Sequence, residues 1–337
     1  MALGWAIIGT GRVSDKTAGA IQAADDATLV AVLSRNREKG NTFAAAHGSP
    51  AVFQTLDDLL RSDEVDVVYI ASPNILHSEQ AQQAARSGKH VFCEKPMALD
   101  PLSGLDMIHA CRDNGVTLGI GFHYRQHPAH QFMRDIFLSG HLGQGVFADA
   151  SAYLAGLDTP SWYNDPELSA GSGVLSMSGV HRIDLLRFIM DAEVDELSAF
   201  VDTRTEGRLF DDSVTAMLRF DNGVVATIRF AIEAARAGDP VAVYCSEGSI
   251  TTIETTSQWW VRAGGKVAVL SQGKESLKEF EITDLYLEQV ESFKRAINGE
   301  ESQIATGEDG LRAVEIASAI YDSARRRQVV RVGRQES

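Results

Sequence analysis

Residues 3–14 read LGWAIIGTGRVS, a short apolar strand followed by a glycine turn, and a helical stretch continues from about Lys16 to Ala24. Such a turn is typical of a phosphate-binding βα unit, because glycines let the backbone bend and the helix N-terminus offers free N–H donors. Gly9 would permit the bend, and Ser14 stands where a third glycine or alanine is usual. A plain strand-to-helix connection is the alternative. The predicted cofactor-binding residues of the turn are Gly9, Thr10, Gly11, Arg12 and Val13.

Beyond this turn, apolar strands alternate with helical patterns as far as Gly121. This alternation predicts a parallel, doubly wound sheet. We expect strands at 28–33, 65–71, 90–93 and 116–120, and helices at 39–47, 55–61, 78–87 and 101–114.

After Phe122 the alternating segments are longer, and Asp221-Asn222-Gly223 predicts a hairpin turn between two of them. We therefore predict an α/β Rossmann domain over residues 1–121 and an α+β domain over 122–337. The second domain would have a large open, mainly antiparallel sheet and would serve substrate binding and oligomerisation, and its helix 308–327 can pack back on the first domain. The expected strands are 145–153, 196–202, 213–220, 223–232 and 240–245, and the expected helices are 179–190, 285–297 and 308–327.

The composition of the chain limits its expected binding partners and its expected location in the cell. The chain has 337 residues, 44% of them hydrophobic and 23% charged, and a net charge of −15, which argues against nucleic-acid or anionic-membrane partners. The three cysteines, Cys93, Cys111 and Cys245, are far apart and fit reduced thiols. No secretion signal and no apolar run of about 18 residues is found. A cytoplasmic location is the expectation.

Two motifs carry candidate catalytic groups. Residues 90–97 read HVFCEKPM, in which Lys95 follows a short strand and Pro96 stiffens the turn that presents it. An ammonium placed there can hydrogen-bond the reacting oxygen of a substrate. His181 can exchange a proton near neutral pH, and Asp184, one helical turn away, would orient its imidazole. A surface lysine and an ordinary core histidine are the alternatives.

With the glycine turn, Glu94-Lys95-Pro96 and His181-x-x-Asp184 in this order, the chain resembles the glucose-fructose oxidoreductase, inositol dehydrogenase and rhizopine-catabolism (Gfo/Idh/MocA) family over its full length. Within it, the chain looks most similar to the NADPH-dependent 1,5-anhydro-D-fructose reductases, through motifs such as Leu33-Ser34 and Thr306-Gly307-Glu308-Asp309-Gly310. The resemblance implies that Glu94 and Lys95 line the active site and that Lys95 contacts substrate. It also places Ser72, Pro73, Asn74 and His77 beside the cofactor, for which a plain turn before a helix is the alternative.

The end of the second strand predicts the cofactor. An acidic side chain there favours NAD, whereas this chain has Ser34 and Arg35, with Lys39 close behind. A hydroxyl and a guanidinium suit the 2′-phosphate of NADP, because phosphate needs charge-assisted donors. We expect NADP to be preferred, with NAD as the second cofactor. A solvated helix start is the alternative interpretation.

The chain departs from the family at two positions. The aspartate that usually precedes the histidine helix is Met177, which cannot exchange protons. In the segment Trp162-Tyr163, Tyr163 replaces an arginine of the subgroup, while Trp162 keeps an expected cofactor contact. Tyr286 corresponds to a cofactor-side position, with a core tyrosine as the alternative.

A histidine-rich segment, residues 123–130, follows the first domain. His123 and Arg125 are expected in the substrate cleft, together with Lys95, Tyr163, Met177, His181 and Asp184. The three histidines could also indicate a metal-binding site. Pro128 disfavours this interpretation because it interrupts the helical spacing of the histidines, so we predict no metal.

Together these features predict an oxidoreductase that moves hydride between NADP and a sugar, polyol or related carbonyl compound, with Lys95 and His181 as catalytic residues. A keto-sugar of the anhydrofructose type is one such substrate. By resemblance we expect a homodimer or homotetramer. Two rivals stay open: a redox-neutral, NAD-using epimerase or glycoside-cleaving enzyme, and an NADP-binding regulator that has lost catalysis.

Overall fold

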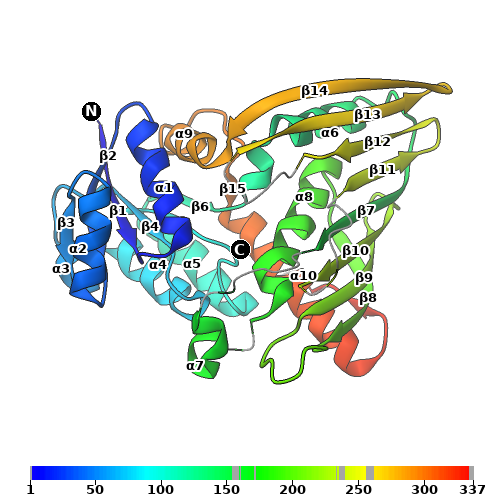
Figure 1. Ribbon diagram of the computed structural model, residues 1–337. Helices are drawn as coiled ribbons and strands as arrows, with labels where there is room; N and C mark the ends of the chain where they lie inside the picture. The colour runs from blue at the N-terminus through cyan, green and yellow to red at the C-terminus, as the bar shows by residue number, and fades with distance from the viewer. Residues whose placement is uncertain are drawn as a thin grey trace. The chain divides into compact units, whose positions relative to one another are not determined.

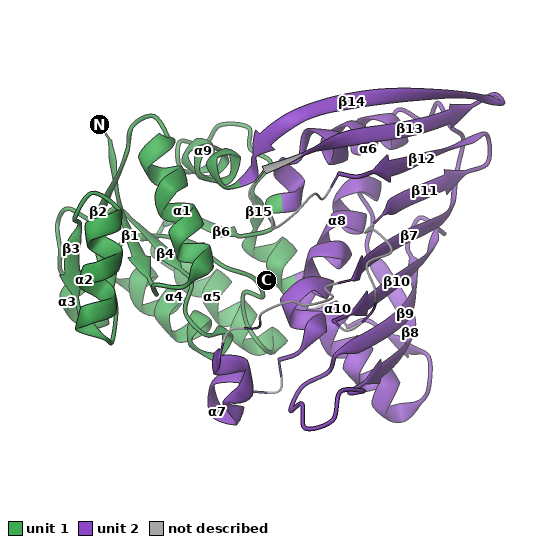
Figure 2. Cartoon of the chain, in the orientation of Figure 1, with its two compact units in different colours: residues 1–123, 286–311, 337 green, residues 124–285, 312–336 purple. Residues whose placement is uncertain are grey.

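The computed structural model describes residues 2–153, 159, 161–170, 172–232, 234, 240–255 and 262–333 (Figure 1). These residues form two compact units, which Figure 2 separates by colour. Unit 1 comprises residues 1–123, 286–311 and 337, and unit 2 comprises residues 124–285 and 312–336. Residues 286–311 thus belong to unit 1, although the sequence suggested one division at residue 121. Whether 1–121 and 122–337 fold as separate domains stays a prediction.

Unit 1 contains a seven-stranded sheet in the order β15-β6-β5-β4-β1-β2-β3. All its pairings are parallel except that of β15 with β6. The order reverses at β1, which pairs with both β2 and β4, as in a doubly wound nucleotide-binding sheet. The strands are β1 (Leu3–Ile8), β2 (Ala27–Leu33), β3 (Ala51–Phe53), β4 (Val67–Ile70), β5 (His90–Cys93), β6 (Leu118–Ile120) and β15 (Ala305–Thr306).

The helices of unit 1 begin where the sequence supplies caps. Thr55 accepts a hydrogen bond from the Asp58 N–H, and Asp100 accepts one from the Ser103 N–H with Pro101 in the first turn. The helices are α1 (Arg12–Ala23), α2 (Arg37–Ala46), α3 (Leu56–Leu60), η1 (Asn74–Leu76), α4 (His77–Arg86), α5 (Pro101–Asp113) and α9 (Leu285–Ile297). The short helix η2 (His123–Gln126) spans the boundary between the units, with only His123 in unit 1.

An aromatic cluster fills the core of unit 1. Trp5 of β1 and Phe92 of β5 both pack against Phe293 of α9, with ring centroids 5.9 Å and 5.0 Å from it. A Cβ on Gly119 would lie 2.6 Å from the Phe293 ring, so the glycine of β6 makes room for this helix. Close packing of α9 on the sheet therefore explains why a segment from late in the chain belongs to unit 1.

Unit 2 contains a nine-stranded sheet in the order β14-β13-β12-β11-β7-β10-β9-β8-β16, antiparallel except between β10 and β7. The predicted hairpin is present: β9 and β10 pair antiparallel, and Gly223 adopts a φ of +88° between them. The predicted fold class is confirmed. The strands are β7 (Gly145–Tyr153), β8 (Val194–Asp202), β9 (Ser213–Phe220), β10 (Val225–Ala231), β11 (Val241–Cys245), β12 (Gly248–Ile253), β13 (Arg262–Ser271), β14 (Lys274–Asp284) and β16 (Val330–Arg331).

One helix of unit 2 corrects a sequence-based assumption. Pro128 does not break a helix but begins α6 (Pro128–Leu138), because proline is favourable in a first turn and the His127 side chain accepts from the Ala129 N–H. The other helices are η3 (Ser161–Asn164), α7 (Pro166–Ser169), the π-helical segment η4 (Leu175–Gly179), α8 (Val180–Met190) and α10 (Gly307–Arg326), whose first residues belong to unit 1.

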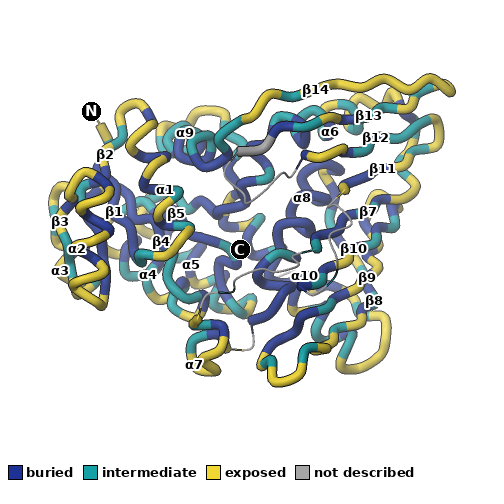
Figure 3. The backbone as a smooth tube through the Cα atoms, viewed as in Figure 1, coloured by how far each residue is buried: buried dark blue, intermediate teal, exposed yellow. Residues whose placement is uncertain are grey.

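Every residue of α8 is buried, including His181, Arg182, Asp184 and Arg187 (Figure 3). Buried charges need partners, so this helix must be held by polar contacts as well as by packing. By contrast, β14 is largely exposed. Within the described residues, no helix combines the length and apolar character needed to cross a membrane.

Candidate active site

The predicted cofactor residues of unit 1 gather at the carboxyl edge of its sheet. Strands β1, β2, β4 and β5 end one residue before Gly9, Ser34, Ala71 and Glu94. Backbone hydrogen bonds continue the ladder past the strand ends, from the Gly9 N–H to Leu33 and from the Glu94 N–H to Ile70, at 3.0 Å and 2.9 Å. Open α/β sheets bind nucleotides at this edge.

The glycine turn fits a dinucleotide pyrophosphate. Gly9 has a φ of +104°, and a Cβ there would lie 2.7 Å from the Ala71 carbonyl oxygen, so only glycine suits this bend. Gly11 precedes α1, whose first turn receives no side-chain cap. A Cβ on Gly11 would meet no described atom within 4 Å, so there is open space at this position beside the start of α1. Thr10, Arg12 and Val13 adjoin this space along the chain and are at least partly exposed.

At the end of β2, Ser34 and Arg35 play different roles. The buried Ser34 hydroxyl donates to the Asn36 carbonyl oxygen at 2.8 Å, and the Asn36 side chain in turn caps α2 by accepting from the Lys39 N–H. The side chains of Arg35 and Lys39 are exposed. The guanidinium is therefore the stronger candidate for a phosphate, and the choice between NADP and NAD stays a prediction.

His77 joins two segments of this edge. Its Nε2 lies 2.9 Å from the carbonyl oxygen of Ser72, and its Nδ1 lies 2.9 Å from that of Pro96. Burial of the ring lowers the His77 pKa, and the nearby Lys95 charge acts in the same direction. The imidazole thus connects the turn that holds Lys95 to the Ser72-Pro73-Asn74 loop, in which Asn74 is buried and Ser72 and Pro73 are partly exposed.

Glu94 is buried, and the adjoining Lys95 is partly exposed. The Tyr69 hydroxyl donates to Glu94 Oε1 at 2.7 Å, and the Lys95 N–H donates to Oε2 at 3.2 Å. Burial raises the Glu94 pKa, which Lys95 and the Tyr69 bond partly offset, and burial lowers the Lys95 pKa against the opposing effect of Glu94. The Lys95–Pro96 peptide bond is cis. Sequence reasoning missed Tyr69, although a tyrosine stands out in an otherwise apolar strand.

Two aromatic rings complete the candidate residues of unit 1. His123, which follows β6, stacks on Tyr286 of α9, with ring centroids 5.5 Å apart and planes at 24°. Both side chains are 3% exposed. Their expected contacts, His123 with substrate and Tyr286 with cofactor, stay predictions.

In unit 2, the π-helical segment η4 leads directly into the helix that carries His181. Met177 lies within η4 and is buried, and its N–H bonds the Gly173 carbonyl oxygen at 2.9 Å. The His181 ring meets the Tyr124 ring edge-on at 5.2 Å, and the Arg182 guanidinium lies 4.5 Å from the centre of that ring. Tyr124 and Arg182 were not predicted. Interruptions of this kind in helices often mark functional sites.

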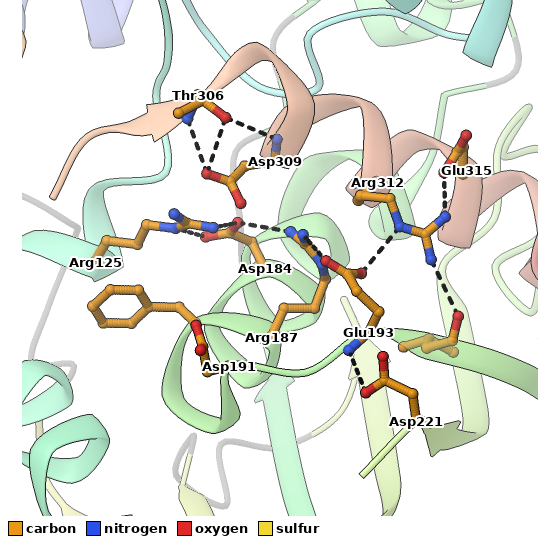
Figure 4. Close-up of polar contacts among 12 residues, drawn as sticks. Arg125, Asp184, Arg187, Asp191, Glu193, Asp221, Thr306, Asp309, Arg312 and Glu315 are labelled. Carbon is orange, nitrogen blue, oxygen red and sulfur yellow. Dashed lines mark hydrogen bonds and ion pairs between the residues drawn. The ribbon is translucent and has the colours of Figure 1, made fainter. Parts of the chain in front are cut away.

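Asp184 and Arg125 form a buried bidentate ion pair. Arg125 Nε and Nη2 donate to the two carboxylate oxygens at 2.8 Å and 2.6 Å. The Arg187 guanidinium lies 3.6 Å from the same carboxylate and also donates a hydrogen bond to Glu193 (Figure 4). Glu193 accepts a further hydrogen bond from Arg312 of α10. This network gives partners to the three buried charges Arg125, Asp184 and Arg187. The expected roles of Asp184 beside His181 and of Arg125 beside substrate stay predictions.

A second buried acid, which sequence reasoning missed, holds η4. Asp211 accepts a hydrogen bond from the Leu175 N–H at 3.1 Å and another from the Tyr321 hydroxyl at 2.7 Å. A Cβ on Gly173 would lie 2.1 Å from Asp211 Oδ1, so glycine is needed where the segment approaches the acid. Asp211 thereby links the residues before Met177 to α10.

The Trp162-Tyr163 segment forms η3. The two rings stack at 4.0 Å, and Tyr163 also meets Phe210 edge-on at 5.4 Å. Tyr163 is 4% exposed, whereas Trp162 is half-buried. Their expected substrate and cofactor contacts stay predictions.

The remaining histidines of residues 123–130 bind backbone atoms. His127 Nε2 lies 2.8 Å from the Thr255 carbonyl oxygen, and His130 Nδ1 lies 2.9 Å from that of Tyr124. Across the described ranges, no cluster of three or more histidine, cysteine or acidic side chains is arranged to hold a metal ion.

The structure thus groups the candidates into two sets. Unit 1 contains the glycine turn, Ser34, Arg35, the 72–77 segment, Glu94, Lys95, His123 and Tyr286. Unit 2 contains Arg125, Trp162, Tyr163, Met177, His181 and Asp184. Convergence of Lys95 and His181 on one substrate stays a prediction.

Comparison with known families gives two matches. Residues 3–122 match the model of the oxidoreductase family with an NAD-binding Rossmann fold, GFO_IDH_MocA, and residues 130–251 match the GFO/IDH/MocA C-terminal domain.

Individual relatives extend over nearly the whole chain. A 1,5-anhydro-D-fructose reductase of Ensifer adhaerens is 31% identical over 325 residues, which are 95% of this chain and 96% of the relative. An NADP⁺-dependent D-xylose 1-dehydrogenase of Haloferax volcanii is 26% identical over 94% of this chain and 96% of its own length. A crystal structure of an aldose-aldose oxidoreductase from Caulobacter crescentus with glycerol has a TM-score of 0.88 and 25% identity, and covers 98% of this chain and 100% of that one.

Proposed function

We propose, on the premise that the chain belongs to the GFO/IDH/MocA oxidoreductase family, that it transfers hydride between NADP and a sugar, polyol or related carbonyl compound. The observation that carries the proposal is the shared sheet edge of unit 1. It presents both a glycine turn with space for a pyrophosphate and, two strands away, the half-buried Lys95. A cofactor site and a candidate catalytic ammonium thus lie on one rigid scaffold.

Lys95 would act on the substrate oxygen. When bound, nicotinamide supplies or accepts a hydride at its C4. In either direction the substrate oxygen carries partial negative charge while the hydride is transferred. An ammonium that donates a hydrogen bond to this oxygen stabilises the developing charge, and it does so most strongly where water is excluded. The partly buried position of Lys95 and the neighbouring charge of Glu94 suit this task.

His181 would handle the proton. An imidazole can protonate the oxygen during reduction or accept a proton during oxidation near neutral pH. Met177 supplies no second acid or base. We therefore assign proton transfer to His181 alone and expect His181→Gln to lower kcat by about a hundredfold or more.

We assign NADP as the preferred cofactor because Arg35 is exposed at the end of β2, where an acid would select NAD. Arg35→Asp should weaken NADPH binding about tenfold or more relative to NADH, since it replaces a charge-assisted donor by a like charge. Titration calorimetry with both cofactors measures this change. Arg86→Asp, an equal charge change at an exposed site on α4, is the matched control and should alter neither affinity. Equal losses for NADPH and NADH in Arg35→Asp would contradict the assignment.

For the substrate we propose a keto-sugar of the anhydrofructose type, on the strength of the 31% identical reductase. A turnover screen with NADPH and NADP⁺ over keto-sugars, cyclic polyols and anhydrosugars tests this proposal. Oxidation of NADPH by a keto-sugar is expected. A cofactor that stays bound through purification without net redox change would instead indicate the redox-neutral alternative.

The screen also separates catalysis from mere cofactor binding. Lys95→Ala should lower kcat by about 10²–10³-fold while NADPH still binds, and Lys274→Ala, at an exposed position of β14, should leave kcat unchanged. Met177 motivates the second candidate, a cofactor-binding regulator without chemistry. Tight NADPH binding with no turnover on the whole panel would favour that candidate.

We also propose a homo-oligomer, because exposed apolar side chains share one face of the unit 2 sheet. Phe147 pairs with Tyr244 across β7 and β11, and the register places Met217 and Phe200 on the same face. Their exposed fractions range from 42% to 74%, and apolar patches of this kind mark interaction surfaces. Light scattering should give a multiple of 36.5 kDa. Phe147→Glu should reduce it to the monomer mass, unlike Leu102→Glu at an exposed position of unit 1.

A further inference from the structure

We propose that Tyr69 is a positioning residue that holds the Glu94 carboxylate and, through its charge, keeps the Lys95 side chain protonated. This inference deepens the proposed function and rests on it for the role of Lys95. Tyr69 belongs to the middle of β4 rather than to any of the motifs at the sheet edge.

Strand register brings Tyr69 and Glu94 together. Strands β4 and β5 are parallel, with Tyr69 opposite Phe92, so Glu94, two residues after Phe92, extends from the same face as Tyr69. The Tyr69 ring is fully buried and packs on Phe92 at a centroid distance of 5.3 Å. The ring is therefore fixed, and its hydroxyl lies 2.7 Å from Glu94 Oε1.

The carboxylate is enclosed on its other sides as well. Its Oε2 accepts from the Lys95 N–H, and a Cβ on Gly121, after β6, would lie 3.0 Å from Oε1. Glu94 is only 7% exposed, so water has little access to its carboxylate and cannot readily replace a hydrogen bond that the protein donates. Removing the Tyr69 hydroxyl would take away the O–H donor on which this buried carboxylate relies.

The charges around the pair give the direction of the effect. Glu94 is bonded by the Tyr69 hydroxyl of β4 and interacts electrostatically with Lys95 and with the Cys93 thiol of its own strand. Lys95 also interacts with His77 of α4, and Tyr69 with Tyr286 of α9. The Tyr69 bond lowers the Glu94 pKa, and ionised Glu94 raises the Lys95 pKa. In Tyr69→Phe, the Glu94 pKa should rise and the Lys95 pKa should fall. Lys95 should therefore lose its proton at a lower pH in this variant.

The test measures Lys95 directly, in the full chain without substrate. Reductive methylation with formaldehyde proceeds only on the free amine, so its rate at Lys95, followed by peptide mass spectrometry across pH, reports the Lys95 pKa. The inflection should fall by about 1–3 pH units in Glu94→Gln and by a smaller amount in Tyr69→Phe. Tyr153→Phe, which removes a partly exposed tyrosine hydroxyl in unit 2, is the matched control and should leave the inflection unchanged.

The double variant tests the route of the effect. If Tyr69 acts through Glu94, Tyr69→Phe should cause no further change in a Glu94→Gln background. An unchanged inflection in Tyr69→Phe, or a shift that persists in that background, would overturn the proposal. Should Tyr69→Phe fail to fold, Glu94→Asp, which withdraws the carboxylate from the hydroxyl, replaces it and should lower the inflection likewise.

This measurement is independent of turnover. If the substrate screen shows no turnover but the methylation profile shifts as predicted, the proposed function is contradicted and the Tyr69 link is supported. Turnover combined with a methylation profile that does not shift in Tyr69→Phe would support the proposed function and contradict the Tyr69 link. Where turnover is found, the alkaline limb of kcat should also move to lower pH in Tyr69→Phe, because the protonated ammonium is lost earlier.

Discussion

The two glycines of the first turn serve different purposes. Gly9 is required by the protein itself, since its φ of +104° and its contact with Ala71 exclude a side chain. Gly11 has no such internal reason, because a Cβ there would meet nothing within 4 Å in the described chain. What distinguishes Gly11 from other exposed glycines is its place immediately before the first turn of α1, where a phosphate ligand would approach the backbone.

This difference predicts the behaviour of two variants of one helix. Gly11→Ala should weaken NADPH binding about tenfold or more while the melting temperature stays unchanged, because the added methyl occupies ligand space only. Gly19→Ala, at an exposed position inside α1, should raise stability by about 0.5–1 kcal/mol and leave NADPH binding alone. Calorimetric titration and thermal melts measure both. Unweakened binding in Gly11→Ala would mean that the pyrophosphate lies elsewhere.

Burial decides what each ion pair contributes. Arg125 and Asp184 have side chains 9% and 1% exposed, whereas Arg219 and Glu196 are 56% and 36% exposed. Arg125→Ala should destabilise the protein by about 3–5 kcal/mol, because it leaves Asp184 buried without its bidentate partner. Arg219→Ala should cost about 1 kcal/mol or less. Urea unfolding compares the two. Similar losses would show that the Asp184 carboxylate is held by other means.

At the scale of elements, η4 depends on an acid from a distant loop. Asp211 bonds the start of η4 and Tyr321 of α10, and η4 continues into the helix of His181. Asp211→Ala should lower the stability by about 1–3 kcal/mol and lower kcat more than it weakens NADPH binding, since it loosens the helix that carries His181. Asp202→Ala, an exposed acid at the end of β8, is the control. Loss of cofactor affinity alone would contradict this role.

The network of α8 also predicts a pH dependence. Burial raises the Glu193 pKa, but the hydrogen bonds and charges of Arg187 and Arg312 outweigh burial and leave it below the ordinary value of 4.5. A carboxylate with a lowered folded-state pKa stabilises the protein above its unfolded pKa and loses this contribution as pH falls through the folded value. Glu193→Gln should therefore melt lower than the wild type at neutral pH, and the gap should close as pH falls below about 4. A gap that is constant between pH 7 and 3 would contradict this assignment.

Local patterns predicted most elements, and their failures have physical causes. The strands Gly145–Tyr153 and Ser213–Phe220 and the helix Leu285–Ile297 have the expected bounds, because alternation and helical spacing follow directly from which face is buried. Helix α6 was missed because Pro128 was taken as a breaker rather than as a first-turn residue. The π-helical η4 has no local signal, since contacts with Asp211, 36 residues away, help to hold it.

The candidate site shows the same limit. Motifs at strand ends were predictable, because the glycine turn and Glu94-Lys95-Pro96 are contiguous in sequence. Tyr69, Asp211 and Tyr321 were not, because their bonds join residues 25 and 110 positions apart. Such partners reinforce a site from inside strands and helices, where a polar residue is easily read as core.

At the scale of the whole molecule, the predicted family and fold class are confirmed, and the chain is a member of a family of NAD(P)-dependent oxidoreductases. The cofactor candidates belong to unit 1, apart from Trp162, and His181 belongs to unit 2. The proposed chemistry therefore requires both units to act on one substrate. NADP preference, the keto-sugar substrate and the assembly remain proposals with the tests given above.

The most direct test of hydride transfer follows an isotope. The protein is incubated with NADPH carrying deuterium at both C4 positions and with the keto-sugar panel, and the products are analysed by mass spectrometry. The account predicts one carbon-bound deuterium in the reduced sugar, and a rate that falls about a hundredfold or more in Lys95→Ala. Bound NADPH with no deuterium in any product, or transfer that is unaffected by Lys95→Ala, would contradict it.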